Sequence, residues 1–150
     1  MTLHFLGAVP RAQLDALSAA IERPFQPFDL ELGRVAAWPR GLLVAEPLRD
    51  EPALLDLHTA LGAALHRAGQ CVDERAFKPH ITLARRAAGA PCPAPPLPQR
   101  WAVSAYALVA SAGGRYRNVA LYPGGVFSGS STDPAPATAQ NPPARRPMPR

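Results

Sequence analysis

The sequence has few cysteines, almost no lysine and no long hydrophobic run. Cys71 and Cys92 are its only cysteines and follow no metal-ligand spacing, so we expect two free thiols. No apolar stretch is long enough to cross a bilayer and no signal peptide is recognisable, so we expect a soluble cytoplasmic protein without a membrane partner. Lys78 is the only lysine, and the positive charge is therefore nearly all arginine.

What the chain does contain is enough hydrophobic sequence for one globular domain. It has 150 residues, 47% of them hydrophobic, which suits one domain better than two. The formal net charge of +5 permits an anionic partner such as RNA without proving one. Residues 128–150 differ in composition, with six prolines and hardly an aliphatic side chain. We expect a folded domain over residues 1–127 and a disordered tail over 128–150.

Hydrophobic periodicity predicts two helices and a series of strands. The expected helices are residues 10–23 and 50–68, and the expected strands are residues 2–6, 28–38, 42–45, 101–111 and 116–122. Gly113 and Gly114 between the last two strands predict a hairpin. His58 falls on the apolar stripe of the second helix with Leu54 and Leu61, which favours a packing role over metal binding.

The stretch from Phe77 to Arg85 carries the clearest chemical signal. Pro79 favours extended backbone before it, and Ile81, Thr82 and Leu83 favour a strand. Side chains alternate along a strand, so His80 and Thr82 share one side while Ile81 and Leu83 pack on the other. An imidazole moves protons near neutral pH and a hydroxyl holds an anionic oxygen, which suits phosphoryl chemistry. A purely structural histidine is the alternative that this spacing leaves open.

Two segments together resemble one known family. Residues 79–85 (PHITLAR) contain a His-x-Thr motif, and residues 2–7 (TLHFLG) repeat its Thr-Leu. From residue 1 to about residue 123 the chain resembles the two-histidine phosphoesterases, specifically the RNA 2′,3′-cyclic phosphodiesterases of the LigT type, once called 2′-5′ RNA ligases. That family has two His-x-Thr-x motifs, the first usually followed by Phe-Leu-Gly and the second by Leu-Ala-Arg.

The resemblance implies a fold, a reaction and a set of site residues. The fold is α+β, with two pseudo-symmetric lobes of antiparallel sheet and outer helices around a central cleft. The reaction is hydrolysis of a terminal 2′,3′-cyclic phosphate to the 2′-phosphate, on RNA ends or 2′,3′-cyclic nucleotides, by a monomer that needs no metal or other cofactor. The implied catalytic residues are His80 as proton acceptor with Thr82 and Thr2 holding phosphoryl oxygens, and the candidate substrate-binding residues are Arg85, His4 and Tyr116.

One departure from the family pattern matters, because the first catalytic histidine would fall immediately before Met1. We therefore expect a chain that lacks a first strand and helix unit, and hence is marginally stable and nearly inactive as it stands. His4 lies about 6.5 Å further along the expected strand, too far to replace the missing imidazole. The alternatives are a non-catalytic binder of RNA ends or nucleotides, a phosphodiesterase for small cyclic nucleotides, and a 2′-5′ RNA ligase.

Overall fold

A computed structural model of the chain describes residues 1–91 and 98–125. Among them are two α-helices, six β-strands and two short 3-10 turns. The helices are α1 (Leu14–Ala20) and α2 (Pro52–Arg67), and the 3-10 turns are Arg11–Gln13 and Pro39–Gly41. The strands are β1 (Phe28–Trp38), β2 (Leu42–Pro47), β3 (Ile81–Ala84), β4 (Gln99–Val103), β5 (Ala105–Ala112) and β6 (Arg115–Pro123).

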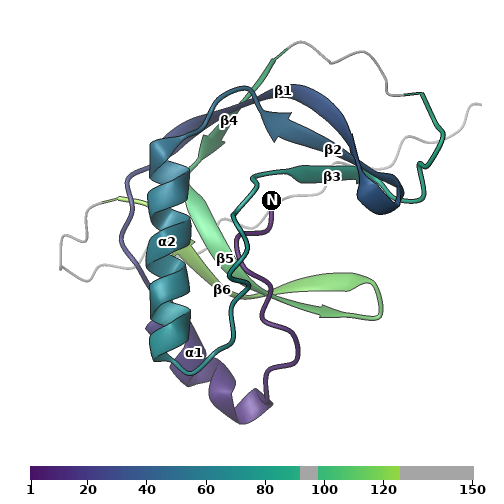
Figure 1. Cartoon of the computed structure of the whole chain (residues 1–150). Coiled ribbons are helices and arrows are strands. Elements are labelled where there is room, and N and C mark those ends of the chain that lie inside the picture. Colours follow the sequence, from purple (N-terminus) through teal and green to yellow (C-terminus); the bar gives the residue numbers. More distant parts are fainter. Residues whose placement is uncertain (92–97, 126–150) are drawn as a thin grey trace, which may run out of the picture.

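The described strands form two antiparallel sheets. The larger sheet has the order β3-β2-β1-β4, and β5 pairs with β6 in the second (Figure 1). Strand β3 therefore lies at the edge of the larger sheet. The β5–β6 hairpin turns through Gly113 and Gly114, both at positive φ, which glycine adopts without the strain that a Cβ brings. This confirms the predicted hairpin and the α+β class with antiparallel sheets.

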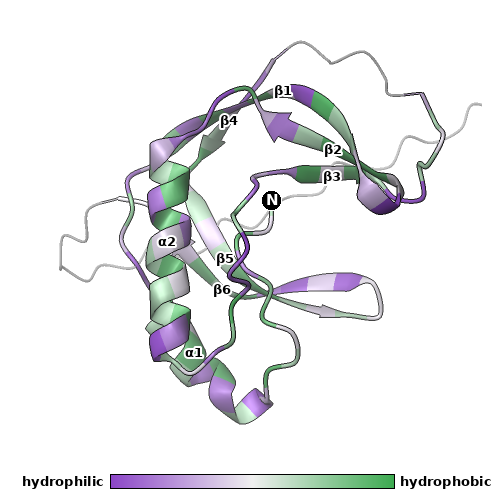
Figure 2. Ribbon diagram, viewed as in Figure 1, coloured by the Kyte–Doolittle hydropathy of each residue, from purple (hydrophilic) through white to green (hydrophobic). Residues whose placement is uncertain are grey.

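Helix α2 supplies much of the hydrophobic core. Its N-terminus is capped by the Glu51 carboxylate, which accepts from the Ala53 amide, and Gly69 at φ +73 ends the helical segment as predicted. The hydrophobic face of α2 meets α1 and the second sheet (Figure 2). The largest buried cluster consists of Leu17, Ile21, Leu57, Leu61, Leu65, Tyr106, Leu108 and Tyr122.

Two of the predicted strands are wrong in detail. Residues 2–6, expected as a strand, have no regular structure and pair with no strand of either described sheet. The expected strand 101–111 is two strands, since the chain leaves the larger sheet after Val103 and joins the second sheet at Ala105. Hydrophobic alternation predicts an extended backbone, but the partner of a strand is decided by tertiary contacts.

The structure tests some of the remaining predictions, while others fall outside the described residues. The expected helix 10–23 is shorter, because its first turn is 3-10 and its α-helical part ends at Ala20. No helix among the described residues is both long and apolar enough to span a membrane. Cys71 is a free, exposed thiol, whereas Cys92 lies outside the described residues. The predicted tail over 128–150 also lies outside them, so the division at residue 127 stays a prediction.

Candidate active site

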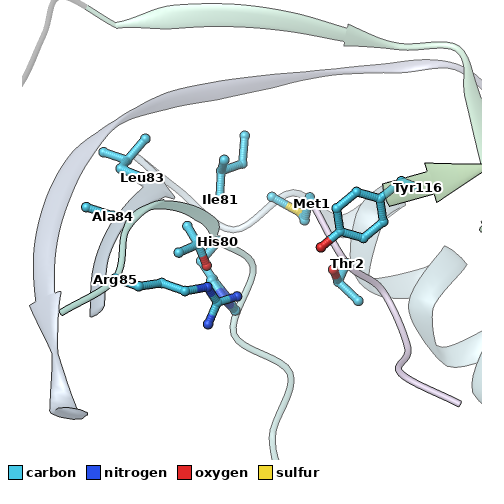
Figure 3. Close-up of a pocket in the computed structure, with 9 residues that line it drawn as sticks. Met1, Thr2, His80, Ile81, Leu83, Ala84, Arg85 and Tyr116 are labelled. Atoms are coloured by element: carbon cyan, nitrogen blue, oxygen red, sulfur yellow. The ribbon is translucent and has the colours of Figure 1, made fainter. Parts of the chain in front are cut away.

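A pocket of about 380 Å³ opens between the edge strand β3, the N-terminal segment and the β5–β6 hairpin. Five of the six residues that the sequence singled out for the site line it. Its lining residues are Met1, Thr2, His80, Ile81, Thr82, Leu83, Ala84, Arg85 and Tyr116. Segments that are far apart in the sequence thus converge on one cavity, which Figure 3 shows in close-up.

His80 sits immediately before β3, with a defined ring orientation. Its Nδ1 lies 2.8 Å from the carbonyl oxygen of Lys78. A carbonyl only accepts hydrogen bonds, so the neutral ring carries its proton on Nδ1 and leaves Nε2 as the free acceptor. This is the tautomer that a general base requires, because the atom that takes the proton must hold a lone pair.

Thr82 and Arg85 lie along and just beyond β3. Thr82 is half-buried and pairs with Val44 of β2, which fixes its backbone, and Arg85 follows the last residue of the strand. The ion pairs in the part of the chain that the structure describes use other arginines, so the exposed Arg85 guanidinium has its donors available to an anion. An arginine fork suits phosphate oxygens.

Thr2 and Tyr116 lie across the pocket from His80 and Arg85 (Figure 3). Tyr116 belongs to β6 and is 78% exposed, so its ring is not part of the hydrophobic core. Thr2 comes from the irregular N-terminal segment, and Met1 beside it lines the same cavity. The pocket therefore has hydroxyl groups on both sides, and the Arg85 guanidinium and the His80 imidazole lie on the same side.

The predicted dry side of β3 is only partly dry. Leu83 is 52% exposed and, like Ile81, lines the pocket. Strand β3 lies at the edge of its sheet, and the register shift between the pairs Val44–Thr82 and Leu43–Ala84 leaves Leu83 without a partner on β2. The expectation that Ile81 and Leu83 pack away from the site is therefore wrong, because both line the same pocket as His80 and Thr82.

The His4 side chain packs against helix α2 and does not line the pocket. Its Nε2 donates to the carbonyl oxygen of His58 at 2.9 Å, and the two imidazoles stack with centroids 4.0 Å apart. The His58 ring stacks in turn on Phe77 at 3.9 Å. A Cβ at Gly62 would lie 3.2 Å from His4 Cε1, so this glycine leaves room for the ring. Because residues 2–6 are not a strand, the alternation that put His4 beside Thr2 does not apply, and we leave His4 out of the proposed site.

One aromatic contact of the site was not predicted from the sequence. The Trp38 indole lies against the His80 imidazole, with ring centroids 4.4 Å apart and planes inclined by 46°. Trp38 ends β1 and is distant from His80 in the sequence, so only the sheet register brings the two rings together.

Residues 1–91 and 98–125 contain no group of three or more His, Cys, Asp or Glu side chains that could hold a metal ion.

Comparisons with known proteins agree with this architecture. Residues 1–115 match the sequence model of the 2′-5′ RNA ligase superfamily. The RNA 2′,3′-cyclic phosphodiesterase of Escherichia coli (strain K12) is 37% identical over 120 residues, covering 78% of this chain and 68% of the relative.

Two solved structures show the same fold. The crystal structure of E. coli LigT complexed with 3′-AMP superposes with a TM-score of 0.72 at 29% identity, over 81% of this chain and 74% of LigT. For the protein TT0787 of Thermus thermophilus the TM-score is 0.62 at 29% identity, over 81% and 75% of the two chains.

Fold and pocket together define an antiparallel α+β protein of the LigT-like phosphoesterase class. The chain belongs to the 2′-5′ RNA ligase superfamily, and it is a homologue of the E. coli RNA 2′,3′-cyclic phosphodiesterase.

Proposed function

We propose that this site hydrolyses the terminal 2′,3′-cyclic phosphate of RNA to a 2′-phosphomonoester, and that the 150-residue chain does so slowly. The observation that carries the proposal is the orientation of His80, whose Nδ1–H is engaged by the Lys78 carbonyl while Nε2 is left as an acceptor in a pocket with Thr82 and Arg85. The homology to the E. coli phosphodiesterase supports the choice of substrate.

The reaction follows from these groups. His80 Nε2 accepts a proton from the attacking water as its oxygen bonds to phosphorus, and the bond from phosphorus to O3′ breaks. Thr82, Thr2 and the Arg85 guanidinium hold the phosphoryl oxygens, whose negative charge grows as the water adds. The departing O3′ needs a proton, and the product retains its phosphate on O2′.

The proposed slowness follows from the imidazoles at the pocket. Among the described residues that line it, His80 is the only histidine, since His4 packs on α2. With one imidazole among the described lining residues, we propose that O3′ takes its proton from solvent and not from a second histidine. A positioned acid contributes about 10²- to 10⁴-fold, so we expect a deficit of that order relative to a two-histidine site.

The first test is hydrolysis of a short RNA that ends in a 2′,3′-cyclic phosphate, followed by ³¹P NMR of the product. We expect slow formation of the 2′-phosphate alone, and loss of this activity in His80→Ala. His66→Ala is the matched control, because His66 is an exposed histidine in the last turn of α2, and its rate should equal that of the unaltered chain. A 3′-phosphate product, or full activity in His80→Ala, would contradict the proposal.

A second candidate is a non-catalytic binder of RNA ends or nucleotides, favoured by the single histidine among the described lining residues of a pocket that keeps its phosphate-holding groups. E. coli LigT has been crystallised with 3′-AMP, NADP+, ATP and phosphate. For a binder, His80→Ala keeps most of the affinity for a 2′-phosphorylated RNA end and Arg85→Ala loses most of it. Calorimetric titration of both variants, with no hydrolysis detected in the unaltered chain, would select this alternative.

A further inference from the structure

We propose that Trp38 is a positioning residue that holds the His80 imidazole in the orientation in which Nε2 is the acceptor. Glu46 and Arg34 in turn hold the Trp38 indole in place. The importance of Trp38 for catalysis rests on the proposed function, whereas its effect on the orientation of the His80 ring does not. The contact is direct, since the two rings lie 4.4 Å apart and inclined by 46°.

The indole is fixed by its own hydrogen bond. Trp38 Nε1 donates to Glu46 Oε1 at 2.8 Å, and Arg34 Nε donates to Glu46 Oε2 at 2.6 Å. The Glu46 side chain is only 15% exposed and uses both carboxylate oxygens, so it has little freedom to turn. The indole is thereby held at its polar edge while its ring meets His80.

The register of the sheet builds this arrangement. Arg34 pairs directly with Glu46, and Arg34, Ala36 and Trp38 alternate onto one face of β1. Ala36 between them carries only a methyl group, which leaves the carboxylate room to reach both neighbours. In the neighbouring pair of strands, β2 and β3, Val44 pairs with Thr82. Val44 is two residues from Glu46, and Thr82 is two residues from His80. The positioning residues and the catalytic pair therefore share one face of the sheet.

His80 needs such support, because its one described hydrogen bond is exposed and holds the ring only while that bond is kept. The Nδ1 contact with the Lys78 carbonyl selects the tautomer, but rotation of the ring about its Cβ–Cγ bond breaks that contact and makes the other tautomer accessible. Contact with the Trp38 ring restricts that motion and directs Nε2 toward the pocket. Trp38 is not one of the described residues that line the pocket, which argues against a role in stacking on a substrate base.

The test is long-range ¹H–¹⁵N NMR of the histidine rings, with the His80 signals assigned by comparison with His80→Ala. In the unaltered chain we expect one His80 ring environment, protonated on Nδ1 and bare on Nε2. In Trp38→Leu we expect averaged nitrogen shifts from a mixture of tautomers. The matched control is Trp101→Leu, which removes a 39% exposed tryptophan from β4 of the same sheet and should leave His80 unchanged. A single His80 ring environment, still protonated on Nδ1, in a folded Trp38→Leu would overturn the proposal.

Glu46 variants keep the test decisive if Trp38→Leu does not fold. Glu46→Gln retains an oxygen that can accept from the indole N–H, whereas Glu46→Ala does not. We expect Glu46→Gln to keep the single His80 environment and Glu46→Ala to give the tautomer mixture. Identical His80 signals in these two variants would overturn the proposed support of Trp38 by Glu46.

Activity supplies a separate outcome. If the chain hydrolyses a 2′,3′-cyclic phosphate, Trp38→Leu should lower kcat about tenfold or more and change KM little, because small misplacements of a catalytic group carry large rate penalties. An unaltered chain without turnover would contradict the proposed function and leave the NMR result standing. A normal kcat in Trp38→Leu together with loosened His80 signals would show that orientation does not limit the rate, and would overturn the catalytic part of the proposal.

Discussion

Two histidines of this chain use opposite ring nitrogens, and that difference separates their roles. His80 donates from Nδ1 to a carbonyl two residues earlier, which leaves Nε2 free at the pocket. His4 donates from Nε2 to the His58 carbonyl and stacks on the His58 ring, so its polar edge is used within the fold. The environment of each ring, and not its residue type, decides which one is available to act as a base.

At the residue scale we predict that His58 makes the fold sensitive to mild acid. Burial, together with the nearby positive charge that His4 can carry, lowers the His58 pKa below its ordinary 6.5. The unfolded chain therefore takes up this proton near pH 6.5 and the folded chain only at lower pH, so stability falls as pH drops through that window. Urea unfolding at about pH 7 and about pH 5 measures the loss.

The variant His58→Phe isolates this effect. It keeps an aromatic ring between His4 and Phe77 and leaves the backbone carbonyl that His4 uses. We expect His58→Phe to lose less stability than the unaltered chain over the same change of pH. The same pH dependence in both proteins would show that another group causes it.

At the element scale the β5–β6 sheet is pinned to the segment around α1 by two tyrosine hydroxyls. Tyr106 donates to the Ile21 carbonyl at 2.8 Å and accepts from the Arg23 amide at 2.7 Å. Tyr122 donates to the Ser18 carbonyl at 2.9 Å, and the two rings stack. These contacts hold the β5–β6 hairpin in place, and Tyr116 of this hairpin lines the pocket.

We predict that Tyr106→Phe destabilises the protein by about 1–3 kcal/mol, because it leaves the Ile21 carbonyl and the Arg23 amide without their hydroxyl partner. Tyr116→Phe is the matched control on the same sheet: its ring is 78% exposed, and we expect its unfolding free energy to stay within experimental error. Chemical denaturation of both variants gives the comparison. Equal stabilities would mean that the Tyr106 hydroxyl does not anchor the hairpin.

At the scale of the whole molecule, the described buried cluster joins the two helices to the second sheet. Its members belong to α1, α2, β5 and β6 or to the ends of these elements. Leu30 and Val44 of the larger sheet are buried as well. The proline-rich composition of residues 128–150 offers few side chains to add to a core.

We therefore predict that a chain ended after Phe127 unfolds at the same denaturant concentration and with the same m-value as the full chain. The m-value reports the surface that unfolding exposes, so a tail that buries none should not change it. Parallel urea titrations provide the measurement. A lower midpoint or a smaller m-value in the shorter chain would show that residues 128–150 pack on the domain.

The sequence by itself determined the family, the class of fold and most of the pocket. The PHITLAR segment identified His80, Thr82 and Arg85 because a local pattern on one strand carries its chemistry with it. The two helices and the Gly113-Gly114 hairpin were also predictable, since helix periodicity and turn chemistry depend on neighbouring residues.

The tertiary structure alone decided which segments meet. The placement of His4 on α2, the transfer of the chain from one sheet to the other after Val103, and the contact between Trp38 and His80 leave no periodic trace in the sequence. The physical reason is that strand pairing and ring packing are contacts between residues far apart in the chain. Their free energy depends on the register of the whole sheet and not on any local preference.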